Sequence, residues 1–403
     1  MQLRVLAGLF VGATAVCGAV TTALGAEVEA AQRVTLFREP SSSNAGITVI
    51  HPQTDASVVL GSTVGLAVGY AVDIVSGATP RVFGVDAVST ATKFSDNRHQ
   101  VRSTLSYLRS VADVAVTGTY AWESDYKSTA ITVATRSDVR DHTFTLGLSY
   151  THNFDSVCDQ NNQLAAGSPL DRVALASAEN CFKGTADVTT RRLHIDSLEP
   201  SVTWAVTPRL LVQGGGTLQV LDGFQANPYR RVALGSAGRT PQESLPEMRQ
   251  RFALFARAAY VFPRTRTSVH LTGRAYRDTW GVEAATGELN INQYLAKFLI
   301  LSARGRLHAQ RGAQFYMTPQ EYRGGPNGRY WTGDRELSPM GNYLVGGKLA
   351  YLRIPESRGS SFINEIEAAA KWEGLFYQLD SANAPNADRK LALIWQLSLS
   401  LRF

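Results

Sequence analysis

The ionisable residues with the most informative spacing recur two positions apart in the second half of the 403-residue chain. Side chains two residues apart on a strand lie on the same face, so each series would line one wall. The basic series is Arg249, Arg251, Arg257, His270, Arg274, Arg304, Arg306 and His308. The acidic series is Glu288, Glu365, Glu367 and Glu373, with Lys348 and Lys371 among them. Such walls either pair their charges across strands or orient solutes, and walls rich in Arg and Lys favour anions.

The histidines do not show the spacing of a catalytic or metal site. They are His51, His99, His142, His152, His194, His270 and His308, and none is part of an H-E-x-x-H motif. Asp138, Asp141 and His142 are close in sequence, but they fall in a predicted turn. Catalysis needs a nucleophile and a base held together. We therefore expect no enzyme activity, catalytic residue, metal or cofactor.

Two cysteines can form a covalent link within one polar segment. Cys158 and Cys181 both follow a predicted strand, whereas Cys17 lies in the N-terminal leader. An exported protein meets an oxidising compartment, where paired thiols oxidise. Two cysteines are too few for a tetrahedral zinc site. The sequence therefore predicts a Cys158–Cys181 disulfide that staples a long loop.

Residues 73–92 carry a concentration of hydroxyl and carboxylate groups at the end of a predicted strand. The candidates for a pore-constricting loop are Ser76, Thr79, Asp86, Ser89 and Thr90. Such groups could narrow a pore or bind a cation. The other interpretation is a turn-rich loop that Gly77 and Pro80 shape.

The C-terminus contains the most regular strand pattern, and such strands must position the residues above. Its apolar residues are Leu391, Leu393, Trp395, Leu397, Leu399, Leu401 and Phe403, with mostly polar residues between them. One face is therefore apolar and suited to lipid. A terminal aromatic on such a strand resembles the signal by which barrel-assembly machinery recognises its clients, and we expect that machinery as a partner.

Similar alternation upstream predicts a barrel. Predicted strands cover 58–75, 98–109, 111–124, 126–137, 142–153, 190–205, 209–221, 247–261, 265–279, 281–293, 298–310, 342–354, 364–378 and 390–403. The long connections 76–97, 154–189, 222–246 and 311–341 all fall on one side, and short turns fall on the other. Outer-membrane barrels place short turns in the periplasm and long loops outside. We therefore predict an all-β, transmembrane, antiparallel up-and-down barrel.

The number of strands depends on the N-terminal part of the mature chain. The series above gives about 14 strands, and 33–39 with 45–52 would bring the total to about 16. Residues 27–57 therefore form either the first hairpin of the barrel or a small plug or arm. We prefer about 16 strands, with residues 58–403 as the main part of the barrel.

The first 26 residues have the form of an export signal. Arg4 supplies a positive start, 5–20 are apolar, and 23–26 offer small residues for cleavage. Composition agrees with a barrel, because 44% hydrophobic residues, 18% charged residues and a mean hydropathy of −0.11 lie between membrane helices and disordered chains. The net charge of +6 is spread out, so we expect no nucleic-acid partner. These features predict the outer membrane of a Gram-negative bacterium.

On this register, alternate residues project inward. The lumen-lining candidates are Asp73, Arg102, Arg251, Arg257, Arg274, Glu288, Arg304, Arg306, Glu365 and Glu367. A barrel of this size leaves a channel unless loops fill it. The sequence therefore favours a porin-like channel or transporter for small solutes or ions, with anionic solutes as the first expectation. The alternative is a closed structural or adhesive barrel that acts through its loops, and an enzyme is a weaker one.

Several segments resemble a family of predicted Gram-negative outer-membrane barrels known as domain of unknown function three-five-seven-zero. The matching segments are 73–80, 86–92, Arg98-His99, 223–230 and 276–281, scattered over roughly residues 45–403. Among these, 73–92 is the most specific. The resemblance implies the fold and the compartment, and it implies no activity, substrate or catalytic residue.

Overall fold

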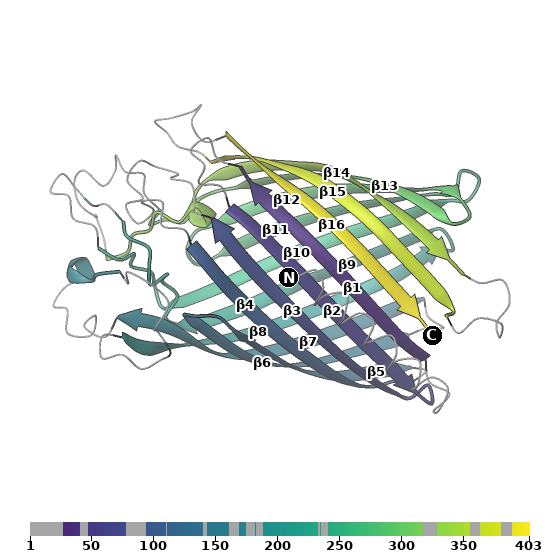
Figure 1. Ribbon diagram of the computed structural model, residues 1–403, viewed down its shortest axis with the longest axis horizontal. Coiled ribbons are helices and arrows are strands. Elements are labelled where there is room, and N and C mark those ends of the chain that lie inside the picture. The colour runs from purple at the N-terminus through teal and green to yellow at the C-terminus, as the bar shows by residue number, and fades with distance from the viewer. Residues whose placement is uncertain are drawn as a thin grey trace.

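The computed structural model is a closed barrel of antiparallel strands, numbered β1 to β16 in chain order (Figure 1). The strands are β1 (Glu27–Glu39), β2 (Ile47–Leu60), β3 (Val64–Gly77), β4 (Phe94–Tyr107), β5 (Ala112–Trp122), β6 (Tyr126–Val139), β7 (Phe144–Gln160), β8 (Val188–Thr207), β9 (Leu210–Gly223), β10 (Met248–Phe262), β11 (Thr267–Asp278), β12 (Glu283–Ala296), β13 (Leu299–Gln310), β14 (Met340–Arg353), β15 (Glu365–Leu379) and β16 (Arg389–Arg402). The predicted fold and the preferred count of 16 strands are confirmed.

The structure describes residues 27–40, 47–77, 94–109, 111–139, 143–160, 169–174, 182, 188–232, 234, 241–316, 329–354, 363–379 and 389–403. Within these ranges there are two short 3₁₀ turns, Pro169–Asp171 and Arg335–Leu337. None of the helical segments described is long and apolar enough to cross a membrane.

The two ends of the chain close the barrel. β1 pairs with β16 over a continuous register from Glu29–Arg402 to Arg38–Leu393, and Figure 1 shows the two strands side by side. At the periplasmic end of this seam, Phe403 is buried against Val28 and Ala30. Residues 27–57 thus supply β1 and most of β2 in this structure.

The connections sort by length between the two ends of the barrel. The described parts of the long connections lie at the left end of Figure 1, and these connections include 161–187 after β7, 224–247 after β9 and 311–339 after β13. The opposite end has short turns such as 263–266 and 297–298, with one longer connection, 354–364. We take the long-loop end as extracellular and the short-turn end as periplasmic.

The predicted single strand 58–75 is wrong, because a tight turn divides it. Gly61 and Ser62 have positive φ values of 55° and 59°, and the Thr63 amide donates to the Leu60 carbonyl at 3.2 Å. These features form a tight turn within a three-residue hairpin connection, 61–63. Leu60 pairs with Val64, so the outward positions stay in phase across the turn. The apolar alternation therefore continued through the hairpin and concealed it.

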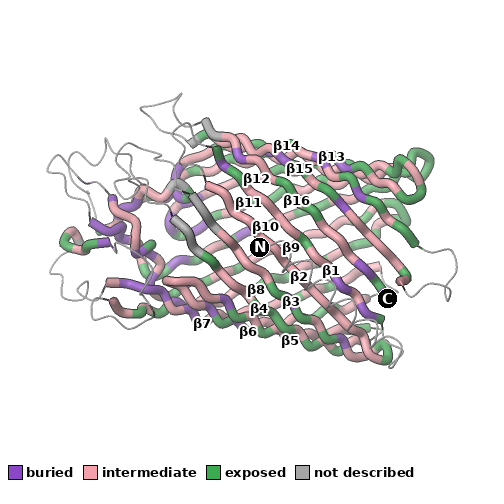
Figure 2. The backbone as a smooth tube through the Cα atoms, viewed as in Figure 1, coloured by how far each residue is buried: buried purple, intermediate pink, exposed green. Residues whose placement is uncertain are grey.

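The outer surface of the barrel is apolar over a central band. On most strands, exposed residues alternate with less exposed ones (Figure 2), and Leu254 and Leu307 are each 70% exposed. Aromatic pairs mark the periplasmic edge of this band, including Phe144–Trp204 and Tyr260–Phe262, with ring centroids 5.6 and 4.7 Å apart. A lipid-facing band between aromatic girdles is typical of outer-membrane barrels.

Candidate functional site

The strand register determines which side chains face the lumen. Residues opposite each other on paired strands share a face. Thr272, Glu288 and Arg306 form one such row across β11, β12 and β13. Because their neighbours Leu271 and Leu307 are exposed on the outer surface, this row lies on the inner wall.

The same alternation places every predicted lumen-lining residue on the inner face. These are Asp73, Arg102, Arg251, Arg257, Arg274, Glu288, Arg304, Arg306, Glu365 and Glu367. They divide into paired and unpaired charges, which the sequence pattern alone did not distinguish.

A network of ion pairs centres on Arg304 of β13. Its guanidinium donates to Glu288 of β12 at 2.7 Å and to Glu373 of β15 at 2.8 Å. Lys371 lies 2.9 Å from the second carboxylate, and Lys348 lies 3.2 Å from Glu367. Except for Glu367, these side chains line a hollow of the inner wall together with Asn290, Asn292 and Ser302. In this part of the wall, acidic and basic groups neutralise each other.

Three arginines beside this network have no carboxylate partner. Arg257, Arg274 and Arg306 project from β10, β11 and β13, and no carboxylate of the described residues lies within ion-pairing distance of them. Arg257 donates only to the Thr272 hydroxyl, at 3.3 Å. The buried Nε of Arg306 has no acceptor in the described part of the chain. This arginine cluster, defined as Arg257, Arg274 and Arg306, leaves net positive charge on one wall.

Across the barrel, on β1 to β7, several charges of the inner face occur in pairs. Asp55 accepts from Arg102 at 2.8 Å, and Asp73 lies 2.7 Å from the His51 ring. Hydroxyl pairs cover much of the remainder, such as Thr132 with Thr151 at 2.8 Å. Arg33 and Arg98 also lie on this inner face without a carboxylate partner among the described residues. The β10–β13 wall differs in carrying three such arginines together, and hydroxyl groups are frequent across from it.

The extracellular loops form a folded layer, which we call the cap: the described residues of 169–174, 224–247 and 311–339. Backbone bonds join its parts, because Ser244 and Trp331 exchange hydrogen bonds of 3.0 and 2.9 Å. The Gln242 amide also donates to the Arg172 carbonyl at 3.1 Å. Three loops far apart in sequence thus act as one layer.

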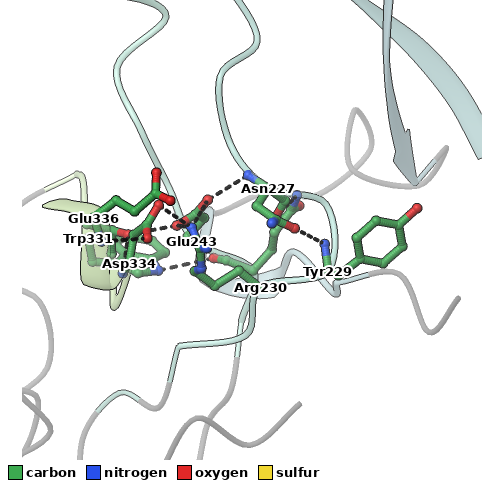
Figure 3. A network of polar contacts seen from close by, with 9 residues as sticks. Asn227, Tyr229, Arg230, Glu243, Trp331, Asp334 and Glu336 are labelled. Atoms are coloured by element: carbon green, nitrogen blue, oxygen red, sulfur yellow. Dashed lines mark hydrogen bonds and ion pairs between the residues drawn. The ribbon is translucent and has the colours of Figure 1, made fainter. Parts of the chain in front are cut away.

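A buried carboxylate lies at the centre of the cap (Figure 3). Glu243 is 1% exposed and accepts hydrogen bonds from the Asn227 amide at 2.5 Å and the Thr332 hydroxyl at 2.7 Å. Arg230 lies 3.2 Å from Glu243 and 2.7 Å from Asp334. Burial raises the pKa of the Glu243 carboxyl above its ordinary value, and the positive charge of Arg230 opposes that rise.

The cap packs against the inner face of the barrel rather than standing above it. Phe224 and Ala226 are buried against Leu193 and Leu221, which are inward-facing residues of β8 and β9. Nearby, the Cζ atom of the buried Arg249 guanidinium lies 4.0 Å from the centroid of the Trp280 ring. The cap therefore narrows the extracellular mouth from the β7–β13 side.

The structure describes only part of the predicted constriction loop and disulfide. Ser76 is in β3, whereas Thr79, Asp86, Ser89 and Thr90 lie outside the described residues, so that hypothesis stays a prediction. Cys158 is fully buried and disulfide-bonded, and its predicted partner Cys181 lies outside the described residues.

Sequence reasoning did not identify the cap as a functional element. Its central residues, Arg230, Glu243 and Asp334, lie in segments without strand periodicity and are widely separated in sequence. One available signal was the segment 223–230, which carried part of the family resemblance. Among the described residues, no group of His, Cys, Asp and Glu is arranged to hold a metal ion.

A family model described as protein of unknown function (DUF3570) matches residues 84–352, which is more than half of the chain. The chain belongs to this family. The match includes the three strands of the arginine cluster and nearly all of the cap. The family description names no activity, and no curated protein matches the sequence.

Several solved structures are similar to this DUF3570 member over most of their length. One is a bacterial polysaccharide outer membrane secretin, with 10% identity, coverage of 94% of this chain and 98% of that chain, and a TM-score of 0.49. A Pseudomonas aeruginosa FadL homologue has 10% identity, coverage of 94% and 89%, and a TM-score of 0.39. OccK2 (OpdF) of the same organism has 9% identity, coverage of 94% and 98%, and a TM-score of 0.38. The fold itself follows from the strand pairing, which closes the barrel through β1 and β16.

Proposed function

We propose that this barrel is a porin-like channel that passes small anionic solutes across the outer membrane. The observation that carries the proposal is the arginine cluster, three guanidiniums on one wall without a carboxylate partner among the described residues. Unpaired Arg side chains in a water-filled pore attract anions and disfavour cations. The hydroxyl groups of the opposite wall suit solutes that also donate hydrogen bonds.

The cap supports selective rather than unrestricted passage. Since it narrows the mouth beside β7–β13, a solute that enters reaches the arginine cluster on the same side. Phosphate- and carboxylate-bearing small molecules are the solutes that this arrangement suits best. We propose no catalytic step and no cofactor.

The proposal is tested by reversal potentials of the refolded protein in planar bilayers under a salt gradient. The variant R257Q/R274Q/R306Q should lose most of the anion preference, while R38Q/R277Q/R311Q, with three arginines removed outside the lumen, should keep it. Equal selectivity in both variants would overturn the proposed role of the cluster. A folded protein without conductance would overturn the channel itself.

A second candidate function is a closed barrel that binds partners through its extracellular surface. The folded cap favours it, because ordered loops with a buried ion-pair core present a fixed surface. The two candidates differ in conductance, so the same bilayer measurement decides between them.

We also propose that barrel-assembly machinery recognises β16 through Phe403, after removal of an export signal at residues 1–26. The apolar alternation of β16 and its terminal aromatic support this proposal. In the membrane, the apolar outer band would contact lipid.

A further inference from the structure

Cationic side chains gather at the periplasmic end of one half of the barrel. We call the set Arg209, Arg264, Arg266, Lys297 and Arg353 the periplasmic arc. They lie at the four successive periplasmic ends of β8/β9, β10/β11, β12/β13 and β14, and all are exposed. Adjacent hairpins are neighbours in the barrel, so the charges form a continuous curve along the rim.

The part of the rim that the structure describes offers the arc no neutralising carboxylate. No carboxylate of the described residues lies within ion-pairing distance of any of its members. The turns 208–209, 263–266 and 297–298 contain no Asp or Glu. On the other half of the barrel, turn 61–63 has no charged residue, the Arg109 guanidinium donates to the Tyr107 hydroxyl at 2.7 Å, and Arg136 lies 3.9 Å from Asp138. The arc is thus a group of five cations over four successive strand ends of the described rim.

The arc lies at the depth of lipid headgroups. Exposed aromatic residues occur within two positions of three of its turns, including Phe262, Phe298 and Tyr351. Such girdles mark the boundary between hydrocarbon and headgroups. Because the arc residues lie at or just beyond this girdle, their side chains reach the level of the phosphates.

We propose that the periplasmic arc binds the phosphate groups of anionic phospholipids in the periplasmic leaflet. Guanidinium groups form paired hydrogen bonds with phosphate oxygens, and four members of the arc are arginines. The adjacent Leu295 and Ile354 are 56% and 64% exposed and offer apolar contacts to acyl chains. This apolar border favours lipid over an acidic periplasmic protein. The inference depends on the membrane position of the barrel and not on its conductance.

Retention of phosphatidylglycerol tests the proposal. The full barrel is refolded into phosphatidylethanolamine vesicles containing phosphatidylglycerol, extracted in mild detergent, and its bound lipid is counted by native mass spectrometry. Each cation near an anionic surface contributes roughly fivefold in affinity, about 1 kcal/mol. The variant R209Q/R264Q/R266Q/K297Q/R353Q should therefore retain at least about tenfold less phosphatidylglycerol. The control R38Q/R192Q/R277Q/R311Q/R329Q has the same charge change at the extracellular end. It should retain as much phosphatidylglycerol as the unmodified protein.

Heat-modifiable migration in gels establishes that each variant is folded. If the quintuple variant does not fold, R264Q/R266Q alters a single turn and should show an intermediate loss of lipid. Equal lipid retention in the arc variant and the control would overturn the proposal. It would also be overturned if the arc variant lost binding to soluble polyglutamate but kept its phosphatidylglycerol, because the arc would then serve an acidic protein.

Discussion

At the scale of single residues, two neighbouring arginines on the inner face of β13 differ in whether a carboxylate pairs with them. Arg304 is held by Glu288 and Glu373, so its charge is largely compensated. Arg306, two positions along, has no such partner among the described residues. Removing either arginine lowers the positive charge of the wall. Removing Arg304 also leaves two carboxylates without their main partner, which costs stability.

Replacement of Glu288 should strengthen the anion preference. Its carboxylate lies within electrostatic reach of Arg257 and Arg306 as well as Arg304. In Glu288→Gln the positive field of the cluster loses its nearest negative charge. The anion-to-cation permeability ratio should rise roughly two- to fivefold, equivalent to about 0.5–1 kcal/mol. Reversal potentials measure it, and a shift toward cations would contradict the assignment of the cluster.

Glu243 should make the order of the cap depend on pH. Its pKa is raised by burial above the ordinary value of 4.5, so the folded cap favours the protonated carboxyl. The proton on Glu243 therefore stabilises the folded cap fully at pH values below 4.5. This stabilisation is lost as the pH rises through the raised pKa of Glu243. Protection of the Ser244 and Trp331 amides from hydrogen exchange, corrected for intrinsic rates, should therefore fall as pH rises. In Glu243→Gln this pH dependence should disappear, and its persistence would assign it to another group.

At the scale of elements, Gly223 controls how the chain leaves β9 and enters the cap. Its φ is +128°, and a Cβ built there would lie 2.2 Å from the Arg192 carbonyl oxygen. Only glycine fits a backbone of this conformation at this distance from another strand. The turn directs Phe224 onto Leu193 and Leu221 and thereby starts the cap.

Gly223→Ala should loosen the cap and leave the barrel intact. The strained backbone and the clash should cost about 1–3 kcal/mol. We expect faster hydrogen exchange at residues 241–247 and unchanged heat-modifiable migration. Gly118→Ala is the matched control, since a Cβ there meets no atom within 4 Å. Similar exchange in the two variants would show that Gly223 does not anchor the cap.

At the scale of the whole molecule, the barrel depends on a seam between the first and last strands. Phe403 is 5% exposed and packs with Val28, Ala30 and Leu401 where β16 meets β1. The same residue is the proposed recognition signal for barrel-assembly machinery. One side chain would thus serve both assembly and closure.

Phe403→Ala should reduce the amount of assembled barrel in cells several-fold and destabilise the refolded protein by about 3 kcal/mol. Leu397→Ala, on the lipid-facing side of the same strand and 65% exposed, is the control for a lost apolar side chain. Heat-modifiable barrel in outer-membrane fractions reports assembly, and urea unfolding of refolded protein reports stability. Normal assembly of the Phe403 variant would contradict the proposed recognition.

The sequence by itself determined the fold, because a lipid-facing strand must alternate and its period is local. Leu391 to Phe403 show this directly, and loop lengths then oriented the barrel. The same alternation of inward and outward residues placed Arg274 and Arg306 on the inner face. It could not reveal the hairpin at Gly61, because the alternation continues across that turn without a shift.

Only the tertiary structure decided which charges are paired and how the mouth is shaped. Arg304 and Glu373 are 69 residues apart, and Arg230 and Asp334 are 104 apart. Their contacts depend on strand register and loop packing, which have no local period. The arginine cluster and the cap therefore emerged from long-range packing, although their residues belong to strands and loops that the sequence had largely predicted.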